Sequence, residues 1–256
     1  MDNKAIENFK NELERPAGVI VVIQDITEHV KLDNMRKEFV ADVSHELKTP
    51  ITSIRGFSEL LLSNSNNLDE DTKKYLKIIY DESIKMKETI DELLYLSNLE
   101  YKKNMNEDKE QIYLIDFIDE SVQRYQRIAA KDQIKIKTDV DDQAYIIEQP
   151  KLFIHLIDNL LSNAIKYNKT NGEVLIKVYQ DEKNIILEVS DTGIGIEEKN
   201  LNKIFERFYR VEESHTTSGT GIGLNIVKQI CNIMNANVTA KSTFNVGTTF
   251  TICFKK

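Results

Sequence analysis

Residues 191–196 read DTGIGI and residues 219–224 read GTGIGL, two short glycine-rich segments near the end of a 256-residue chain. Glycine lets backbone N–H groups approach a phosphate closely and adopts positive φ without strain. The second segment also leads into a helical pattern, and a helix N-terminus favours anions because its first N–H groups lack partners within the helix. Taken alone, either segment is explained as well by a tight turn.

A third segment favours a phosphate-binding role for the two glycine segments over a role as simple turns. In residues 158–167, DNLLSNAIKY, Asn159 and Asn163 are four positions apart and share one face of a helix. Lys166 and Tyr167 follow one turn later. Amide oxygens can hold Mg²⁺, and a lysine can neutralise phosphate charge. Neither glycine segment is a P-loop, because no glycine-lysine-serine/threonine follows, and neither has the strand-turn-helix context of a dinucleotide-binding motif.

The surrounding pattern predicts an α/β sandwich with helices on one face of a mixed sheet. Helices are expected at 114–131, 151–167 and 223–235, and strands at 134–140, 173–180, 184–190, 237–242 and 247–254. Between the glycine segments, residues 197–218 are polar and poor in glycine, so we expect a mobile lid there. Phe205 and Phe208 fit equally well a surface helix whose aromatic side chains pack on the core.

The first half of the chain predicts a helical hairpin, since only two of the nine glycines precede residue 172. Apolar residues three or four apart from about residue 27 to residue 63 indicate one long amphipathic helix. After turn-forming and acidic residues at 63–71, a strict 3,4 spacing from Leu76 to Leu93 indicates a second helix with a coiled-coil seam. One hairpin cannot bury both apolar stripes, so we expect two copies to form a dimeric four-helix bundle.

Composition excludes several classes of protein. A net charge of -8 argues against a general affinity for nucleic acid or anionic lipid. The longest apolar run near the start, residues 17–23, is too short to span a bilayer, and no signal peptide precedes it, so we expect a soluble chain. Cys231 and Cys253 lie in apolar runs without metal-ligand spacing, which predicts neither a disulfide nor a zinc site and favours a reducing, intracellular compartment.

The asparagine segment, DTGIGI, IFERFYR at 204–210 and GTGIGL occur in an order that closely resembles the Bergerat ATP-binding fold of histidine kinases, type II topoisomerases and related chaperones. The resemblance implies that Asp191 hydrogen-bonds the adenine amino group and that Asn163 ligates Mg²⁺. It also implies that Arg210 reaches the γ-phosphate, with Arg207 as a helper. The residues that it assigns to nucleotide binding are Asn159, Asn163, Lys166, Tyr167, Asp191, Gly193, Gly195, Ile196, Arg207, Arg210, Gly219, Thr220, Gly221, Gly223 and Leu224.

Residues 39–50, FVADVSHELKTP, resemble the phosphoacceptor box of the HisKA type of histidine kinase. His45 falls between two apolar positions and is expected to face outward from the helical seam, largely neutral and with one ring nitrogen free to attack. Glu46 can accept the proton of the other ring nitrogen. Thr49, one turn on, is expected to help position water for dephosphorylation of a partner's phospho-aspartate, and Pro50 bends the helix. The predicted catalytic residues are therefore His45, Glu46 and Thr49.

The other three histidines have no such neighbours. His29 lies in the presumed linker, His155 in the helix before Asn159, and His215 in the predicted lid. We interpret all three as solvated or packed side chains.

The resemblance implies three parts and a function. Residues 1–30 resemble a remnant of a PAS-like sensor domain and signalling linker, with only the last strand of that domain present; 31–102 resemble a HisKA dimerisation and histidine phosphotransfer domain, and 108–256 a catalytic ATP-binding domain. The implied activity is ATP- and Mg²⁺-dependent autophosphorylation of His45, followed by transfer to an aspartate in the receiver domain of a response regulator. The implied assembly is a homodimer in the cytoplasmic part of a membrane-anchored sensor kinase, with no nucleic acid and no direct membrane contact from this fragment.

Two alternatives remain at this point. One is a nucleotide-binding scaffold that does not phosphorylate itself, which intact Asn163, Asp191 and His45 disfavour. The other is a hydrolysing clamp ATPase of the same fold, which would need a long transducer domain after the ATP site, whereas the sequence ends at Lys256.

Overall fold

The computed structural model describes the backbone of residues 5–10, 16–22, 44, 47–63, 68–102, 109–211 and 220–256. The chain divides into two compact units, Met1–Glu46 and Leu47–Lys256, and each is described by itself. Among the described residues, no helix has both the length and the apolar character that a bilayer-spanning segment requires.

The first unit contains a β-hairpin. β1 (Ala5–Lys10) pairs antiparallel with β2 (Pro16–Val22). The sequence predicted one strand here, at residues 18–26; β2 overlaps that stretch, whereas the expectation that no other strand is present is wrong because of β1. The apolar residues of β1, Ile6 and Phe9, are three positions apart and do not give the period-2 alternation that indicates a strand. Residues 23–43, where the rest of the predicted strand and the start of the first helix fall, lie outside the described residues.

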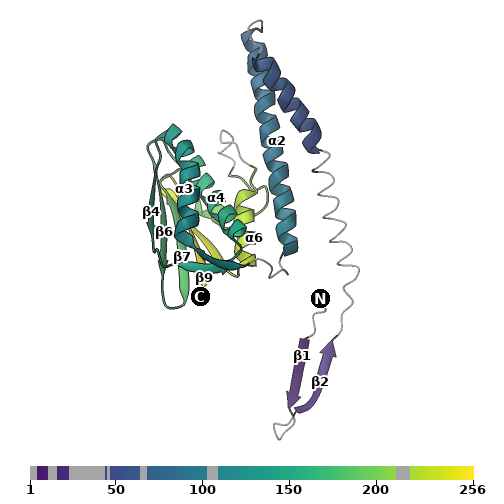
Figure 1. Cartoon of the computed structure of the whole chain (residues 1–256), viewed down its shortest axis with the longest axis vertical. Helices are drawn as coiled ribbons and strands as arrows, with labels where there is room; N and C mark the ends of the chain where they lie inside the picture. The colour runs from purple at the N-terminus through teal and green to yellow at the C-terminus, as the bar shows by residue number, and fades with distance from the viewer. Residues whose placement is uncertain are drawn as a thin grey trace. The chain divides into compact units, whose positions relative to one another are not determined.

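The second unit is built around a five-stranded sheet, which is mixed as predicted (Figure 1). Its strand order is β4-β6-β7-β9-β8. Its strands are β4 (Lys135–Val140), β6 (Glu173–Gln180), β7 (Asn184–Asp191), β8 (Asn237–Thr243) and β9 (Gly247–Lys255). β4 and β6 are parallel, and the other neighbouring pairs are antiparallel.

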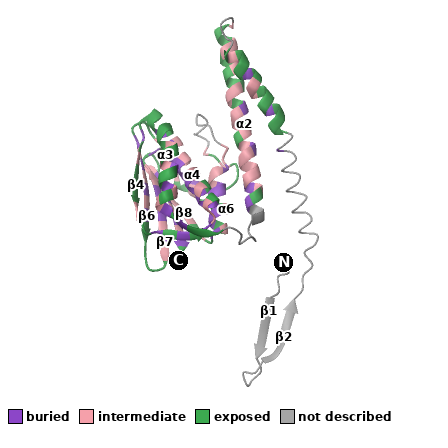
Figure 2. Ribbon diagram, in the orientation of Figure 1, coloured by how far each residue is buried: buried purple, intermediate pink, exposed green. Residues whose placement is uncertain are grey.

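Three helices cover one face of this sheet: α3 (Leu114–Ala129), α4 (Pro150–Lys166) and α6 (Gly223–Ile233). Alternate residues of the strands point toward them, as with Ile185, Leu187 and Val189 on β7, all of which are buried. α4 lies deepest, with eight buried residues (Figure 2). Burying a side chain the size of leucine stabilises the fold by about 2 kcal/mol, so this layer fixes the position of α4.

The short elements of the second unit were not predicted from the sequence. β3 (Glu110–Tyr113) pairs antiparallel with β5 (Tyr145–Glu148) in a separate two-stranded sheet. The predicted helix at 114–131 ends in a 3₁₀ turn, η2 (Ala130–Asp132), and α5 (Glu198–Leu201) forms a single turn in the predicted lid. Four-residue strands offer only one or two buried positions each, too few for a periodic signal.

The helical hairpin is present in the described residues. Residues 47–63 are helical, and α2 (Glu70–Lys102) forms the second arm. Asp69 caps α2, since its carboxylate accepts hydrogen bonds from the Thr72 backbone N–H and hydroxyl at 2.8 and 2.7 Å, which lower the pKa of Asp69. Lys48 and Asp91 form an ion pair of 2.8 Å between the arms.

The hairpin leaves a large apolar surface exposed within one chain. We refer to this surface as the hairpin face. It consists of Leu47, Ile54, Phe57, Leu60 and Leu61 on the first arm and Tyr75, Ile78, Ile79 and Met86 on α2. Phe57 is the most exposed of these side chains, at 68%. An apolar stripe of this size is typical of an interaction surface.

Candidate functional site

The sequence-predicted residues gather around two adjoining cavities beside α4. The first cavity has a volume of about 320 Å³. It is lined by Asn163, Tyr167, Asp191, Ile194, Gly195, Ile196, Glu197, Ile204, Tyr209, Arg210, Val211, Leu224, Phe244, Asn245, Thr248 and Phe250. Most of this wall is apolar or aromatic, as expected for a planar, largely apolar ligand group.

Asp191 is the acidic group of the first cavity. Its Oδ1 accepts hydrogen bonds from the backbone N–H groups of Gly193 at 2.8 Å and Thr248 at 3.3 Å. Burial raises the pKa of this carboxyl to about 6, and the two N–H donors oppose the rise. Because both donors bond one oxygen, the second carboxylate oxygen remains as an acceptor for a ligand amino group.

The DTGIGI segment is tied directly to the end of α4. The Ile194 N–H donates to the carbonyl oxygen of Tyr167 at 3.0 Å. A Cβ on Gly193 would lie 2.1 Å from the same carbonyl oxygen, so only glycine allows the segment to pass this close. The cavity wall and the asparagine helix therefore hold each other in place.

The second cavity, about 330 Å³ in volume, is more polar. It is lined by Glu88, Glu92, Asn159, Ser162, Asn163, Lys166, Tyr167, Ile204, Tyr209, Thr220, Gly221, Gly223 and Leu224. Asn163, Tyr167, Ile204, Tyr209 and Leu224 also line the first cavity. One ligand can therefore occupy both cavities, with an apolar end in the first and a charged end in the second.

The glycine segment at 220–223 shapes the second cavity at the start of α6. Gly221 has a φ of +73°, and a Cβ there would lie 2.8 Å from the backbone of Phe208. Its carbonyl oxygen accepts a hydrogen bond of 3.0 Å from the Phe208 N–H. The segment thus joins the predicted lid to α6, whose N-terminus offers unpaired N–H groups to an anion.

Positive charge is concentrated where the cavities meet. The Lys166 ammonium lies 5.2 Å from the centre of the Tyr167 ring. The pKa of Lys166 is lowered, first by burial and then by the nearby Arg210 guanidinium. Burial also raises the pKa of the Tyr167 hydroxyl. Two cations held close together at a partly buried site are well suited to bind an anion such as a polyphosphate.

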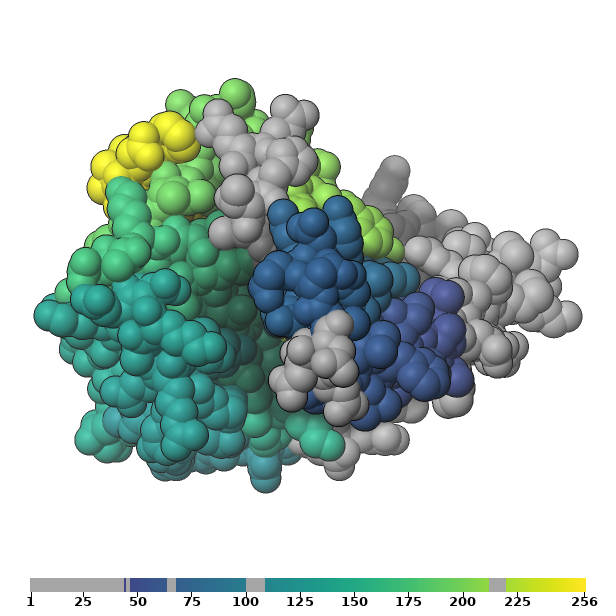
Figure 3. All heavy atoms as spheres, turned by 90° about the horizontal axis from the view of Figure 1, so that it is seen from above, coloured from purple at the N-terminus to yellow at the C-terminus, as the bar shows by residue number. Residues whose placement is uncertain are grey.

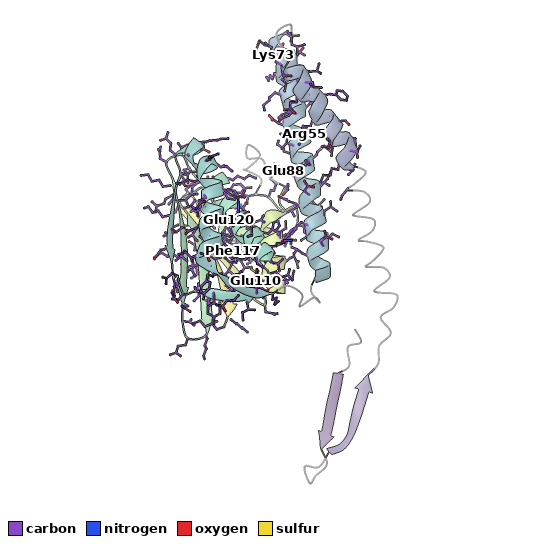
Figure 4. All side chains as sticks on the ribbon, viewed as in Figure 1. Arg55, Lys73, Glu88, Glu110, Phe117 and Glu120 are labelled. Atoms are coloured by element: carbon purple, nitrogen blue, oxygen red, sulfur yellow. The ribbon has the colours of Figure 1, made fainter. Side chains whose placement is uncertain are left out.

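Acidic residues of α2 face this positive charge, a contact that the sequence did not predict. The Thr220 hydroxyl donates to a carboxylate oxygen of Glu92, and Glu88 lies one turn before it on the cavity side of α2 (Figure 4). Burial raises the pKa of Glu92, the Thr220 hydrogen bond and Lys166 oppose the rise, and Glu88 adds to it. α2 contacts α6 at this place, and Figure 3 shows its blue atoms beside light-green atoms of the segment leading into α6.

The described part of the lid is held by packing. Phe205 packs edge-to-face on Phe250, with ring centres 6.4 Å apart, so the core-packing interpretation of Phe205 is confirmed. Phe208 is 56% exposed and has a φ of +61°. The Tyr209 hydroxyl donates to Asn200 at 2.8 Å. Residues 212–219 of the predicted lid lie outside the described residues, so its mobility stays a prediction.

The structure brings most of the predicted nucleotide residues together, but not all. In the described part of the chain, Arg207 is exposed and lines neither cavity. Gly193 also lines neither cavity, but its backbone N–H donates a hydrogen bond to Asp191, which does. Thr49 is exposed on the first arm of the hairpin, away from both cavities. His45, Glu46 and Gly219 lie outside the described residues, so their roles stay predictions.

Several lining residues were missed. Thr248 directly follows Gly247 in GTTF, and its N–H bonds Asp191. The turn between β8 and β9 contributes Phe244 and Asn245. A glycine-threonine pair after a strand-turn pattern could have drawn attention to Thr248, but nothing local marks Glu88 and Glu92, which resemble ordinary exposed charges on a helix.

An α/β sandwich with a partly buried aspartate at an apolar cavity, next to a second cavity lined by a lysine and glycines, defines an ATP-binding domain of the Bergerat class. The family model described as histidine kinase-, DNA gyrase B- and HSP90-like ATPase matches residues 148–256. The model of the His Kinase A (phospho-acceptor) domain matches residues 35–102.

Known proteins agree with this assignment. The sensor histidine kinase WalK of Bacillus subtilis (strain 168) is 35% identical over 246 residues, which cover 93% of this chain and 40% of WalK. Full-length ShkA, solved in complex with AMPPNP, has a TM-score of 0.69 and 20% identity over 85% of this chain and 45% of ShkA. The histidine kinase ThkA, solved in complex with the response regulator protein TrrA, has a TM-score of 0.60 and 23% identity over 100% of this chain and 75% of ThkA. The two solved structures, each under 25% identical, support the fold alone.

The chain belongs to the sensor histidine kinases of two-component signal transduction, with a phospho-acceptor domain followed by an ATPase domain. It spans about two fifths of the length of the curated relatives that it matches.

Proposed function

We propose that this chain binds ATP across the two cavities and transfers its γ-phosphoryl group to His45. One observation carries the proposal: Asn163 in the last turn of α4 and Tyr167 at its C-cap line both the apolar cavity that holds Asp191 and the cationic cavity that holds Lys166. A ligand that fits both has a planar, amino-bearing end and a polyanionic end. An adenine nucleotide has that form.

Each predicted residue has a role in this binding mode. The free carboxylate oxygen of Asp191 accepts the adenine amino group while Ile196 and Leu224 flank the ring. Lys166 in the second cavity and Arg210, which lines the first cavity and lies close to Lys166, neutralise the phosphates, and the start of α6 offers backbone N–H groups near Gly221. Asn159, Gly195, Gly219, Thr220 and Gly223 complete the proposed set, with Arg207 as the least supported member because it lies outside both cavity walls.

The donor set at the second cavity fits Mg²⁺. Asn163 lines both cavities and carries a side-chain oxygen, the type of ligand that Mg²⁺ prefers alongside phosphate oxygens and water. Asn163 would hold the ion. When bound, Mg²⁺ supplies positive charge that neutralises the phosphate oxygens.

The transfer step is an in-line displacement. A ring nitrogen of His45 forms a bond to the γ-phosphorus as the bond between that phosphorus and the β–γ bridging oxygen breaks, and ADP leaves. Glu46 accepts the proton of the other ring nitrogen, so the product is a neutral-ring phosphoramidate. Most of the catalysis comes from positioning the two groups and from neutralising charge.

The proposed assembly is a homodimer through the hairpin. The apolar residues of the hairpin face are exposed to solvent in a single chain, whereas two hairpins would bury each other's apolar residues in a four-helix bundle. The second proposed partner is a receiver domain whose aspartate takes the phosphoryl group from His45, by analogy with ThkA, which was solved in complex with the response regulator protein TrrA. Thr49, exposed on the first arm of the hairpin, is suited to a phosphatase step on that partner.

We propose further that residues 31–102 and 108–256 act as the phosphotransfer and catalytic domains of a longer cytoplasmic region, and that residues 1–30 belong to a PAS-like sensor. The β1–β2 hairpin supports a β-rich domain at that end of the chain. The proposal includes no nucleic acid and no direct membrane contact for this fragment.

Incubation of the purified chain with γ-labelled ATP and Mg²⁺ tests the proposal. We expect acid-labile, base-stable label on the wild type and none on His45→Ala or Asn163→Ala, with ATP binding retained in His45→Ala. His29→Ala is the matched control, because His29 lies in the predicted linker and its loss should leave the label unchanged. If the wild type binds ATP and stays unlabelled, the chain is a nucleotide-binding scaffold instead.

A further inference from the structure

We propose that Glu92 of α2 is an autoinhibitory residue, whose carboxylate occupies the second cavity in place of the nucleotide's phosphates and must leave when ATP binds. This inference rests on the proposed function, because it assigns a regulatory contact to the same nucleotide site.

The contact is specific. Glu92 accepts a hydrogen bond from the hydroxyl of Thr220, a residue 128 positions away in the glycine segment. The Ile222 N–H also donates to this hydroxyl, at 3.2 Å, so Glu92 is bonded to the segment that opens α6. A proposed phosphate-binding segment is therefore already bonded to an anion, supplied by α2 of the same chain.

The charges around Glu92 match those that a polyphosphate would meet. Lys166 attracts Glu92 and Glu88, and Arg210 lies close enough to Lys166 to repel it. Both glutamates line the second cavity with Asn159 and Asn163. Any ligand phosphate that approaches these cations also approaches the two carboxylates, and like charges repel strongly in a partly buried site.

This arrangement couples binding to movement of α2. ATP brings several negative charges to the place that the carboxylates occupy. The free energy needed to displace Glu92 therefore reduces the free energy of ATP binding and weakens the observed affinity. Adenosine occupies only the first cavity and meets neither glutamate. The penalty should therefore be absent for adenosine, intermediate for ADP and largest for ATP.

A second contact explains why only part of α2 would move. One turn after Glu92, the Tyr95 ring stacks on His155 of α4 with centres 4.1 Å apart. Neither ring lines a cavity, so this stack is compatible with bound nucleotide. α2 can then pivot at the stack, so that the part of α2 before Tyr95 moves away from the second cavity.

Isothermal titration of the full chain with adenosine, ADP and ATP tests the inference, in wild type and in Glu92→Gln. The glutamine keeps an oxygen that can accept the Thr220 hydrogen bond, so the substitution removes charge and little else. We expect ATP to bind about tenfold more tightly to Glu92→Gln, which is about 1.4 kcal/mol, with a smaller gain for ADP and none for adenosine. The gain should shrink at high salt.

Glu82→Gln is the matched control, since Glu82 lies on the same helix and pairs with Lys85 away from both cavities. Equal ATP affinity in wild type and Glu92→Gln would overturn the inference while leaving the nucleotide site intact. Weaker binding of ATP with Mg²⁺ to Glu92→Gln would overturn it in favour of Glu92 as a metal ligand. Failure of all three ligands to bind either protein would overturn the proposed function as well.

Discussion

Replacing Asp191 by asparagine should make the protein more stable and less able to bind ATP. Asp191 is a largely buried carboxylate whose Oδ1 accepts two backbone hydrogen bonds. An asparagine oxygen can accept both bonds, which places the amide N–H₂ where the second carboxylate oxygen stood. The substitution therefore removes a buried charge and turns the ligand-facing acceptor into a donor.

The magnitude follows from the pKa of Asp191, which burial raises from 3.8 to about 6. Below pH 3.8 the carboxyl is protonated in both folded and unfolded chains, and ionisation costs no stability. As the pH rises through about 6, the folded state must ionise a group that the unfolded state ionises more easily. A difference of about two pKa units then destabilises the fold by about 3 kcal/mol at pH 8, a cost that asparagine avoids.

Urea unfolding followed by circular dichroism, without nucleotide, measures this effect. We expect Asp191→Asn to raise the unfolding free energy by about 2 to 3 kcal/mol at pH 8, with little gain near pH 4. Asp119→Asn, an exposed carboxyl on α3, is the control and should change it little. ATP affinity of Asp191→Asn should fall about 10- to 100-fold, because two donors face each other. Equal stability at pH 8, or unchanged ATP affinity, would refute the reasoning.

Three further substitutions test other parts of the molecule. Gly193→Ala places a Cβ 2.1 Å from a carbonyl oxygen and should destabilise the fold by about 2 kcal/mol or more in calorimetry, whereas Gly56→Ala, with open space around it, should be neutral or stabilising. Phe57→Glu puts a charge on the hairpin face and should weaken dimerisation at least tenfold in sedimentation velocity; an unchanged dimer constant would exclude this face as the interface. Leu187→Ala, fully buried in β7, should cost about 2 to 5 kcal/mol in urea unfolding, and a loss below 1 kcal/mol would contradict the core described.

Long periodic segments made much of this fold predictable. The asparagine helix was predicted at 151–167 and is observed at Pro150–Lys166, because its apolar residues recur every three or four positions along one buried face. β6 was predicted at its observed bounds, since its buried and less buried residues alternate from Glu173 to Tyr179. His155 was interpreted as a solvated or packed side chain, and in the structure it is exposed on α4 with its ring stacked on Tyr95.

Features that depend on contacts distant in sequence could not be predicted. β3 and β5 are four residues each, and their pairing joins segments more than thirty positions apart. Glu92 resembles any solvated charge on an amphipathic helix, and only the tertiary structure brings it to Thr220. For the same reason Phe244, in a turn between two strands, gave no local indication that it lines the first cavity.

Asn163 and Tyr167 make the two cavities interdependent. Asn163 lies in the last turn of α4 and Tyr167 at its C-cap, and a hydrogen bond of 3.0 Å joins the Tyr167 N–H to the Asn163 carbonyl oxygen. Because both residues line both cavities, a displacement of the C-terminal end of α4 would reshape the two cavities together. The apolar end and the charged end of a ligand are therefore recognised as one unit.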